Sequence, residues 1–466
     1  LHPRVRRQRQ MCIRDRLKAV KDGEIEESLV DEKVRNILRM MLRLKMIGPE
    51  RKHRKTGAYN TEEHRRAVLD VARESMILLK NEDQVLPLQA ESGCKVAVIG
   101  ANAAAIHSNG GGSAEIKALY EISPLMGIKK LLGGNVKVSY APGYVIPDKK
   151  EASEINWQAA STETAENTEK ESTVSGRTLD EKQQEALAEA VALAKASDIV
   201  IFVGGLNHDF DVEGLDRVNM KLPYGQDEVI DALLKAVPDT VVCMYAGAPV
   251  EMPWAEKAKA ILWSYYAGME GGTALAEILS GKVNPSGKLA ETFIRDASQC
   301  PAHTIGTFGK KDRVEYREGV MVGYRYYDTK KTDVLFPFGH GLSYTAFTYN
   351  DLEIIRQQEN GRQTVKVSCS VTNTGEHAGK ETVQIYVAPE QKKDRPVHEL
   401  KAFEKVRLDA GETKRICVIL EERDFSRYDT DKKMPVPVNG TYEIQVGASS
   451  TDICLCGKID LFFAEG

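Results

Sequence analysis

Short apolar runs alternate with helical patterns between Lys95 and Leu279, and this alternation constrains the fold more than any other feature of the sequence. Strands that alternate with helices favour a mostly parallel sheet that is covered by helices on both faces. We therefore predict an α/β sandwich domain over residues 90–293. The strand-sized runs are 95–100, 136–140, 198–204, 240–245 and 260–264, and the helical patterns lie around 119–132, 185–196, 226–237 and 273–279.

The pattern changes after residue 336, where apolar and polar residues begin to alternate with a period of two. This period is typical of strands with one buried face, and turn residues such as Asn439-Gly440 separate the runs. We predict an antiparallel β-sandwich over 336–466, joined to the first domain by a connector at 294–335. The predicted fold class is α/β plus all-β. The alternating runs are 364–372, 382–388, 414–420 and 441–447.

The remaining segments have patterns of their own. Residues 1–16 hold six arginines and one aspartate, and we interpret them as a non-native basic segment. Helical spacing predicts one helix over 28–46 and another over 62–79, the latter inside a linker segment 57–89. An open apolar face on the first helix would favour self-association, so a homo-oligomer is one expectation. Residues 148–182, rich in Glu, Ser and Thr, are predicted to form a polar surface insertion.

Composition excludes several classes of protein. The net charge of −4 lacks the sign that nucleic acids attract, so no nucleic-acid partner is expected. No run approaches the ~20 apolar residues that a membrane-spanning helix needs, so no membrane span is expected. The eight cysteines lack the paired spacing of a zinc site, and neither a metal nor a cofactor is predicted.

A dense group of titratable side chains follows the most apolar strand. In open α/β sheets, ligands bind beyond the carboxyl ends of the strands, so this loop is the first place to look for a site. Glycoside hydrolysis requires two carboxyl groups, one of which donates a proton, and Glu213 is a candidate donor. A solvated polar loop is an equally good interpretation of the composition alone. The loop, residues 206–217, contains His208, Asp209, Asp211, Glu213, Asp216 and Arg217.

From residue 17 onward the chain resembles the C-terminal portion of a family 3 glycoside hydrolase of the β-glucosidase type. The resemblance implies a (β/α)8 barrel, an α/β sandwich and a fibronectin type III-like β-sandwich, in that order. It also implies that the barrel is missing here except for its closing helix, within 17–56. The runs that carry the resemblance are 73–81, 86–88, 110–114, 213–217, 268–272, 284–289, 323–328, 336–344 and 371–375.

The same resemblance implies roles for individual residues. Glu213 takes the role of the acid/base, while the nucleophilic aspartate belongs to the barrel and cannot be assigned in this chain. The implied reaction is hydrolysis of terminal β-D-glycosides by retaining double displacement, and the implied substrates are β-linked glucosides or short oligosaccharides. The residues implied to support the loop or bind substrate are His208, Asp211, Asp216, Arg217, Gly111, Gly112 and Ser113.

Two alternatives stay open at this point. The chain by itself, which we expect to be inactive, has an alternative interpretation as a non-catalytic sugar-binding or interaction fragment. Within the enzyme class, a β-xylosidase is the alternative to a β-glucosidase. The sequence itself leaves the compartment unknown, and only the family resemblance suggests a periplasmic or secreted protein.

Overall fold

The computed structural model describes residues 17–53, 57–147, 179–214, 216–309, 313–359, 362–390 and 395–463. The chain divides into two compact units, 1–61 and 62–466. The first unit contains helix α2 (Glu27–Arg43), and the second contains every sheet described below. The predicted basic segment 1–16 and residues 148–178 of the predicted polar insertion lie outside the described residues.

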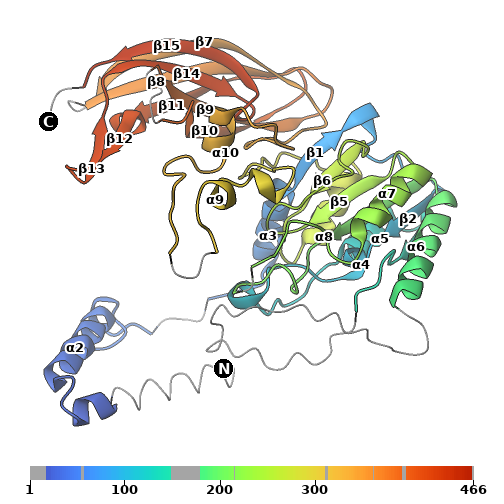
Figure 1. The fold of residues 1–466 in the computed structure, drawn as a ribbon, viewed down its shortest axis with the longest axis horizontal. Helices are drawn as coiled ribbons and strands as arrows, with labels where there is room; N and C mark the ends of the chain where they lie inside the picture. The colour runs from blue at the N-terminus through green and yellow to red at the C-terminus, as the bar shows by residue number, and fades with distance from the viewer. Residues whose placement is uncertain are drawn as a thin grey trace. The chain divides into compact units, whose positions relative to one another are not determined.

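A six-stranded sheet organises the first part of the larger unit (Figure 1). Five of its strands run parallel, and β1 pairs antiparallel with β6 at one edge. The five parallel strands lie within one residue of the predicted runs. In spatial order the strands are β1 (Ile77–Asn81), β6 (Ala260–Trp263), β5 (Val241–Tyr245), β4 (Ile199–Gly205), β2 (Lys95–Ile99) and β3 (Lys137–Ala141).

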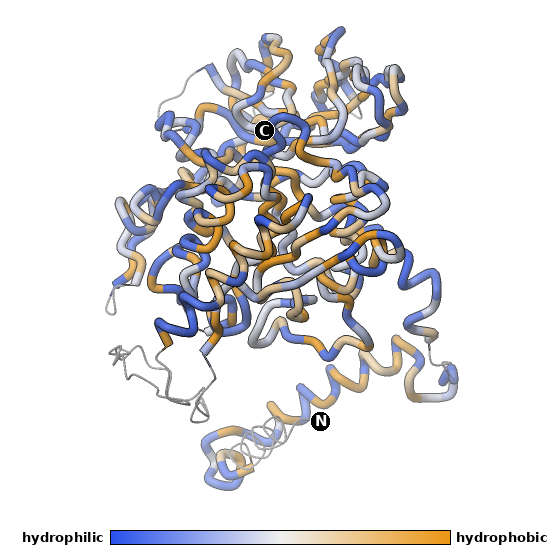
Figure 2. Tube along the Cα trace, turned by 90° about the vertical axis from the view of Figure 1, so that its right-hand side faces the viewer, coloured by the Kyte–Doolittle hydropathy of each residue, from blue (hydrophilic) through white to orange (hydrophobic). Residues whose placement is uncertain are grey.

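Alternate residues of each strand enter two different hydrophobic cores, because successive side chains point to opposite faces of a sheet. In β2, for example, Val96 and Val98 join one core, whereas Ala97 and Ile99 join the other. Figure 2 shows the resulting concentration of hydrophobic residues at the centre of this part. Helices α6 (Leu179–Lys195) and α7 (Gln226–Ala236) cover one face, and α3 (Glu62–Ser75), α5 (Pro124–Leu132) and α8 (Gly271–Leu279) cover the other.

The prediction of a helix over 62–79 was wrong in its second part. Helix α3 ends at Ser75, and Ile77–Asn81 forms the edge strand β1. Ile77 and Leu79 enter one core while Leu78 enters the other, so this short apolar run is buried on both faces. Periodicity cannot separate such a run from a buried turn of helix, and pairing with β6 decided the outcome.

The C-terminal part is an antiparallel β-sandwich, which confirms the predicted fold class of α/β plus all-β. One sheet has the order β10-β9-β14-β15 and the other β11-β8-β7, while β12 and β13 form a separate hairpin. The strands are β7 (Phe347–Glu359), β8 (Arg362–Asn373), β9 (Gly379–Pro389), β10 (Glu399–Leu408), β11 (Thr413–Glu421), β12 (Ser426–Asp429), β13 (Met434–Pro437), β14 (Gly440–Gly447) and β15 (Ile453–Leu461).

Short helices complete the described elements. Helix α4 (Ala101–Ala104) follows β2, and α9 (Pro301–Thr304) and α10 (Tyr324–Lys330) lie in the connector. The remaining turns are 3-10 helices: η1 (Glu82–Gln84), η2 (Gly112–Ala114), η3 (Ala297–Gln299) and η4 (Glu422–Phe425).

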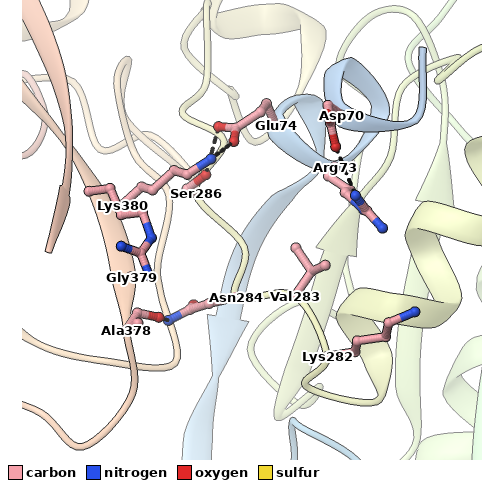
Figure 3. A pocket seen from close by; sticks show the side chains of 11 residues that line it. Asp70, Arg73, Glu74, Lys282, Val283, Asn284, Ser286, Ala378, Gly379 and Lys380 are labelled. Atoms are coloured by element: carbon pink, nitrogen blue, oxygen red, sulfur yellow. Dashed lines mark hydrogen bonds and ion pairs between the residues drawn. The ribbon is translucent and has the colours of Figure 1, made fainter. Parts of the chain in front are cut away.

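Ionic contacts join the α/β sandwich to the β-sandwich. Glu74 of α3 forms ion pairs with Lys380 of β9 and with Lys405 of β10. Burial acts to raise the pKa of the Glu74 carboxyl, but the hydrogen bonds and charges of the two lysines outweigh it and lower that pKa. Figure 3 shows the Glu74–Lys380 contact at the wall of a cavity of about 410 Å³, which α3, the segment after α8 and β9 line together.

Candidate active site

The winding of the sheet changes direction at the carboxyl ends of β2 and β4. From β2 the chain crosses to β3 on one side and then returns to β4 on the other side, so the winding reverses between β2 and β4. Ligands of open α/β sheets bind at such a reversal. The loops that follow these two strands carry the glycine-rich turn Gly110–Ala114 and the Glu213 loop, so the topology brings both candidate segments to one place.

The two loops contact each other through their backbones. The amide of Gly111 donates to the carbonyl of Asp211 at 3.0 Å, and Gly111 and Val212 form an isolated parallel bridge. Gly112 has a φ of +75°, and a Cβ there would lie 2.8 Å from the Cβ of Glu213. A side chain at position 112 would therefore strain the backbone and push Glu213 away.

Glu213 itself is exposed. Its Oε2 accepts a hydrogen bond from the backbone amide of Ser113 at 3.0 Å and another from the Ser113 hydroxyl. Both donors engage the same carboxylate oxygen. Ser113, which the resemblance implies as a loop-support or substrate-binding residue, thus orients the predicted acid/base, and the carboxyl group is not buried in the sandwich.

Asp211 anchors the same loop to two neighbouring strands. Its Oδ2 accepts from the amide of Gly247, which follows β5, at 2.6 Å and from the hydroxyl of Tyr266, which follows β6, at 2.9 Å. Burial and the nearby Asp211 charge raise the pKa of the Tyr266 hydroxyl, so the hydroxyl stays protonated and donates. Asp211 lies two residues before Glu213, and its contacts support the loop.

Of the remaining predicted site residues, His208 and Arg217 form hydrogen bonds to the backbone, whereas Asp216 is exposed. His208 contacts the carbonyl of Asn109 through Nε2 at 2.7 Å and so adds a third link between the two loops. Arg217 donates to the carbonyl of Pro249 at 3.0 Å. Among the described residues, no ion pair links Arg217 to Asp216. Asp216 is exposed. Arg217 therefore supports the loop through a backbone contact.

His107, which the sequence interpretation missed, lies beside this network. Its ring centroid is 6.3 Å from that of His208 and 6.4 Å from that of Tyr266. Burial, with a smaller contribution from the charge of His208, lowers the pKa of His107 to about 4, so its ring is neutral at neutral pH. Both of its ring nitrogens are buried without a hydrogen-bond partner.

Tyr266 and Gly247 were also missed, although a signal for them existed. Both directly follow apolar strand runs, and the rule that led to the Glu213 loop applies equally to the carboxyl ends of β5 and β6. No sequence pattern indicated that Gly247 and Tyr266 would contact Asp211, because these two residues lie 36 and 55 positions further along the chain.

Neither a cluster of possible metal ligands nor a membrane-spanning helix occurs among the described residues. The His, Cys, Asp and Glu side chains of the described part of the chain form no group of three or more that is arranged to hold a metal ion. The helices of that part include none that is both long enough and apolar enough to cross a membrane.

Comparison with known proteins identifies the family. Residues 76–344, more than half of the chain, match the glycosyl hydrolase family 3 C-terminal domain, and residues 381–450 match a fibronectin type III-like domain. The chain belongs to glycosyl hydrolase family 3. Glu213 and the residues that anchor its loop all lie inside the first of these matches.

The similar curated proteins carry β-glucosidase names. The chain is 38% identical to thermostable beta-glucosidase B of Acetivibrio thermocellus over 440 residues. The matched region covers 94% of this chain and 53% of that protein. The chain is also 38% identical to a beta-glucosidase of Bacteroides ovatus, over 94% of this chain and 56% of that protein. The chain thus spans little more than half the length of these relatives.

Solved structures agree with this assignment. The family 3 beta-glucosidase of Bifidobacterium adolescentis matches with a TM-score of 0.76 and 33% identity, over 96% of this chain and 60% of that one. DesR, a beta-glucosidase of Streptomyces venezuelae solved with D-glucose, matches with a TM-score of 0.81 and 26% identity, over 96% of this chain and 66% of that one.

Proposed function

We propose that Glu213 is the general acid/base of a retaining β-glucosidase to which this chain contributes the α/β sandwich and the β-sandwich. Its nucleophile lies outside this chain. The observation that carries the proposal is the position of Glu213: an exposed carboxyl group at the winding reversal, oriented by Ser113 and placed on a loop that Asp211 anchors. Membership of family 3 supports the reaction class.

The reaction proceeds in two proton transfers at one carboxyl group. In the first step, Glu213 donates its proton to the glycosidic oxygen while the external carboxylate attacks the anomeric carbon, so the aglycone leaves as an alcohol. In the second step, Glu213 takes a proton from water as the water attacks the glycosyl ester. Because Ser113 engages only Oε2, we assign proton transfer to Oε1.

The substrates are proposed to be terminal β-D-glucosides, including short β-linked oligosaccharides. The two curated relatives described above are β-glucosidases by name, and DesR was solved with D-glucose. These names favour glucosides over xylosides.

The acid/base role is tested by the Glu213→Ala substitution in the complete polypeptide that contains this chain. General acid/base catalysis contributes about 10²- to 10⁴-fold, so turnover of nitrophenyl glucoside is expected to fall within that range. Added azide is expected to restore part of the turnover, because azide attacks the glycosyl ester without needing a base. The matched control is Glu228→Ala, an exposed glutamate in the first turn of α7, which should retain activity. Full activity of Glu213→Ala would refute the assignment.

The external nucleophile is tested by an assay of this chain alone on nitrophenyl glucoside. We expect no hydrolysis, because the family resemblance assigns the nucleophilic aspartate to the barrel and to no residue of this chain. Measurable hydrolysis that Glu213→Ala abolishes would show that a nucleophile is present in this chain and would contradict this part of the proposal.

A further inference from the structure

The side chain of Tyr266 lies where the loops of four adjacent strands meet. Tyr266 follows β6, and its hydroxyl donates to Asp211 in the loop after β4. A Cβ added to Gly247, which follows β5, would lie 3.3 Å from Cε2 of the tyrosine ring. A Cβ added to Gly110, in the loop after β2, would lie 4.0 Å from Cδ2 of the same ring. The strands lie side by side in the order β6-β5-β4-β2, so one residue connects the loops at all four carboxyl ends.

The carboxylate of Asp211 is held in place by two donors. Its Oδ2 accepts from the amide of Gly247 at 2.6 Å and from the hydroxyl of Tyr266 at 2.9 Å. Hydrogen bonds to a charged acceptor are stronger than those between neutral groups. A Cβ at position 247 would lie 2.8 Å from the same oxygen, which is closer than van der Waals contact allows. The lack of a side chain at Gly247 therefore lets its amide approach, and the two donors together fix Oδ2.

The position of Asp211 sets the position of the backbone that carries Glu213. A single residue, Val212, separates the two, and it forms a parallel bridge with Gly111. The amide of Gly111 also donates to the carbonyl of Asp211 at 3.0 Å. Because of these contacts, a displacement of Asp211 would shift the bridge and move Glu213 with it.

Proton transfer by Glu213 depends on its placement. A general acid has to lie within hydrogen-bonding reach, about 2.6–3.2 Å, of the atom that it protonates. A misplacement of about 1 Å can lower a rate about 10²-fold, even when the change that causes it lies away from the reacting atoms. A side chain that fixes the Glu213 loop can therefore control the rate of proton transfer.

We propose that Tyr266 is a positioning residue of the reaction, whose hydroxyl acts through Asp211 to hold Glu213 within reach of the leaving-group oxygen. The proposal rests on the proposed acid/base role of Glu213. Loss of the hydroxyl weakens general acid catalysis, and it leaves KM nearly unchanged because the hydroxyl binds Asp211 and not the substrate.

The Tyr266→Phe variant of the complete polypeptide that contains this chain tests the proposal, because it removes the hydroxyl and keeps the ring. Two substrates separate proton donation from the rest of the reaction. Cellobiose has an alcohol as leaving group and needs a proton donor, whereas dinitrophenyl glucoside releases a stable anion and needs none. We expect kcat/KM, which reports the first step, to fall at least about tenfold for cellobiose and to stay within about twofold for dinitrophenyl glucoside.

Three further variants complete the experiment. Gly247→Ala displaces the same Asp211 oxygen by its Cβ and should reproduce the preference for dinitrophenyl glucoside, so the proposal is tested even if Tyr266→Phe fails to fold. Tyr120→Phe is the matched control, because its hydroxyl donates to the Glu270 carboxylate at 2.7 Å, outside the Glu213 loop. It should change neither value. Glu213→Ala, which removes the acid itself, should show the same preference in a stronger form.

The outcomes distinguish this proposal from the proposed function. Equal losses on both substrates, or no loss on cellobiose, in Tyr266→Phe and Gly247→Ala would overturn the positioning role if Glu213→Ala still prefers dinitrophenyl glucoside. If Glu213→Ala shows no such preference, the acid/base assignment itself is wrong.

Discussion

Helices α2 and α3 are neighbours in the sequence, yet they differ in how their side chains are buried. Helix α2 carries eight large apolar residues and buries none of its side chains, with Ile37 54% exposed and Leu38 43% exposed. Helix α3 has fewer large apolar residues, but Ala72 is 1% exposed and Arg73 reaches Glu277 of α8. The comparison teaches that amphipathic spacing makes a helix, whereas specific contacts decide whether that helix becomes part of a core.

The largest expected effect comes from breaking the anchor of α3. Glu277 is buried, and its Oε2 lies 2.7 Å from Nε of Arg73 while its Oε1 lies 2.7 Å from Nζ of Lys282. The Arg73→Met variant should destabilise the α/β sandwich by about 3 kcal/mol, because it removes one partner of a buried charge. Chemical denaturation followed by the fluorescence of the buried Trp254 and Trp263 measures this loss.

Two further variants sharpen that measurement. The double variant Arg73→Met/Glu277→Met should recover most of the loss, since the buried carboxylate that lost Arg73 is then removed as well. Arg66→Met is the matched control, because the Arg66–Glu62 pair on the same helix is exposed and contributes about 0–1 kcal/mol. Equal effects of Arg73→Met and Arg66→Met would show that the α3–α8 contact does not hold the helix in place.

A smaller effect is expected from Glu74, which follows Arg73 on α3. Because the pKa of its carboxyl is lowered in the folded protein, the stabilisation is present above the ordinary glutamate pKa and is lost as the pH falls through the lowered value. The side chain is 35% exposed, so solvent screening reduces the contribution to about 0.5–1 kcal/mol. Glu74→Gln should therefore destabilise the protein more at pH 7 than at pH 3, as measured by denaturation at both values. A loss that is the same at both pH values would contradict the role of the two lysines.

The smallest effect is expected on α2. Ile37→Ala should change the free energy of unfolding by less than about 0.5 kcal/mol, because an exposed side chain loses little contact when it is truncated. Leu69→Ala on α3 is the matched control and should cost about 2 kcal/mol, since Leu69 packs against the core. Should Ile37→Ala prove as costly as Leu69→Ala, the apolar face of α2 would have to be covered in solution, and sedimentation velocity would then show whether a second copy covers it.

Much of the fold could be predicted because its signals are local. The runs at β2 and β4 are apolar on both faces and bounded by glycine or polar residues, so each reads as a buried strand without knowledge of its neighbours. The Glu213 loop could be located for the same reason, as the segment that follows such a strand. Strand β1 could not be distinguished from helix, since its identity depends on pairing with β6, which lies about 180 residues further on.

The candidate site likewise has features that depend on local sequence and others that depend on contacts between distant segments. The spacing of residues in this one chain was enough to indicate a carboxylate-rich loop at a strand end, together with the fold class of α/β plus all-β. The contacts of Ser113 with Glu213 and of Tyr266 with Asp211 depend on which strands became neighbours, and that order follows from packing the whole sheet. Periodicity reflects the local preference of each segment, whereas a hydrogen bond between distant segments exists only where packing of the hydrophobic faces has brought those segments together, so only the tertiary structure decides it.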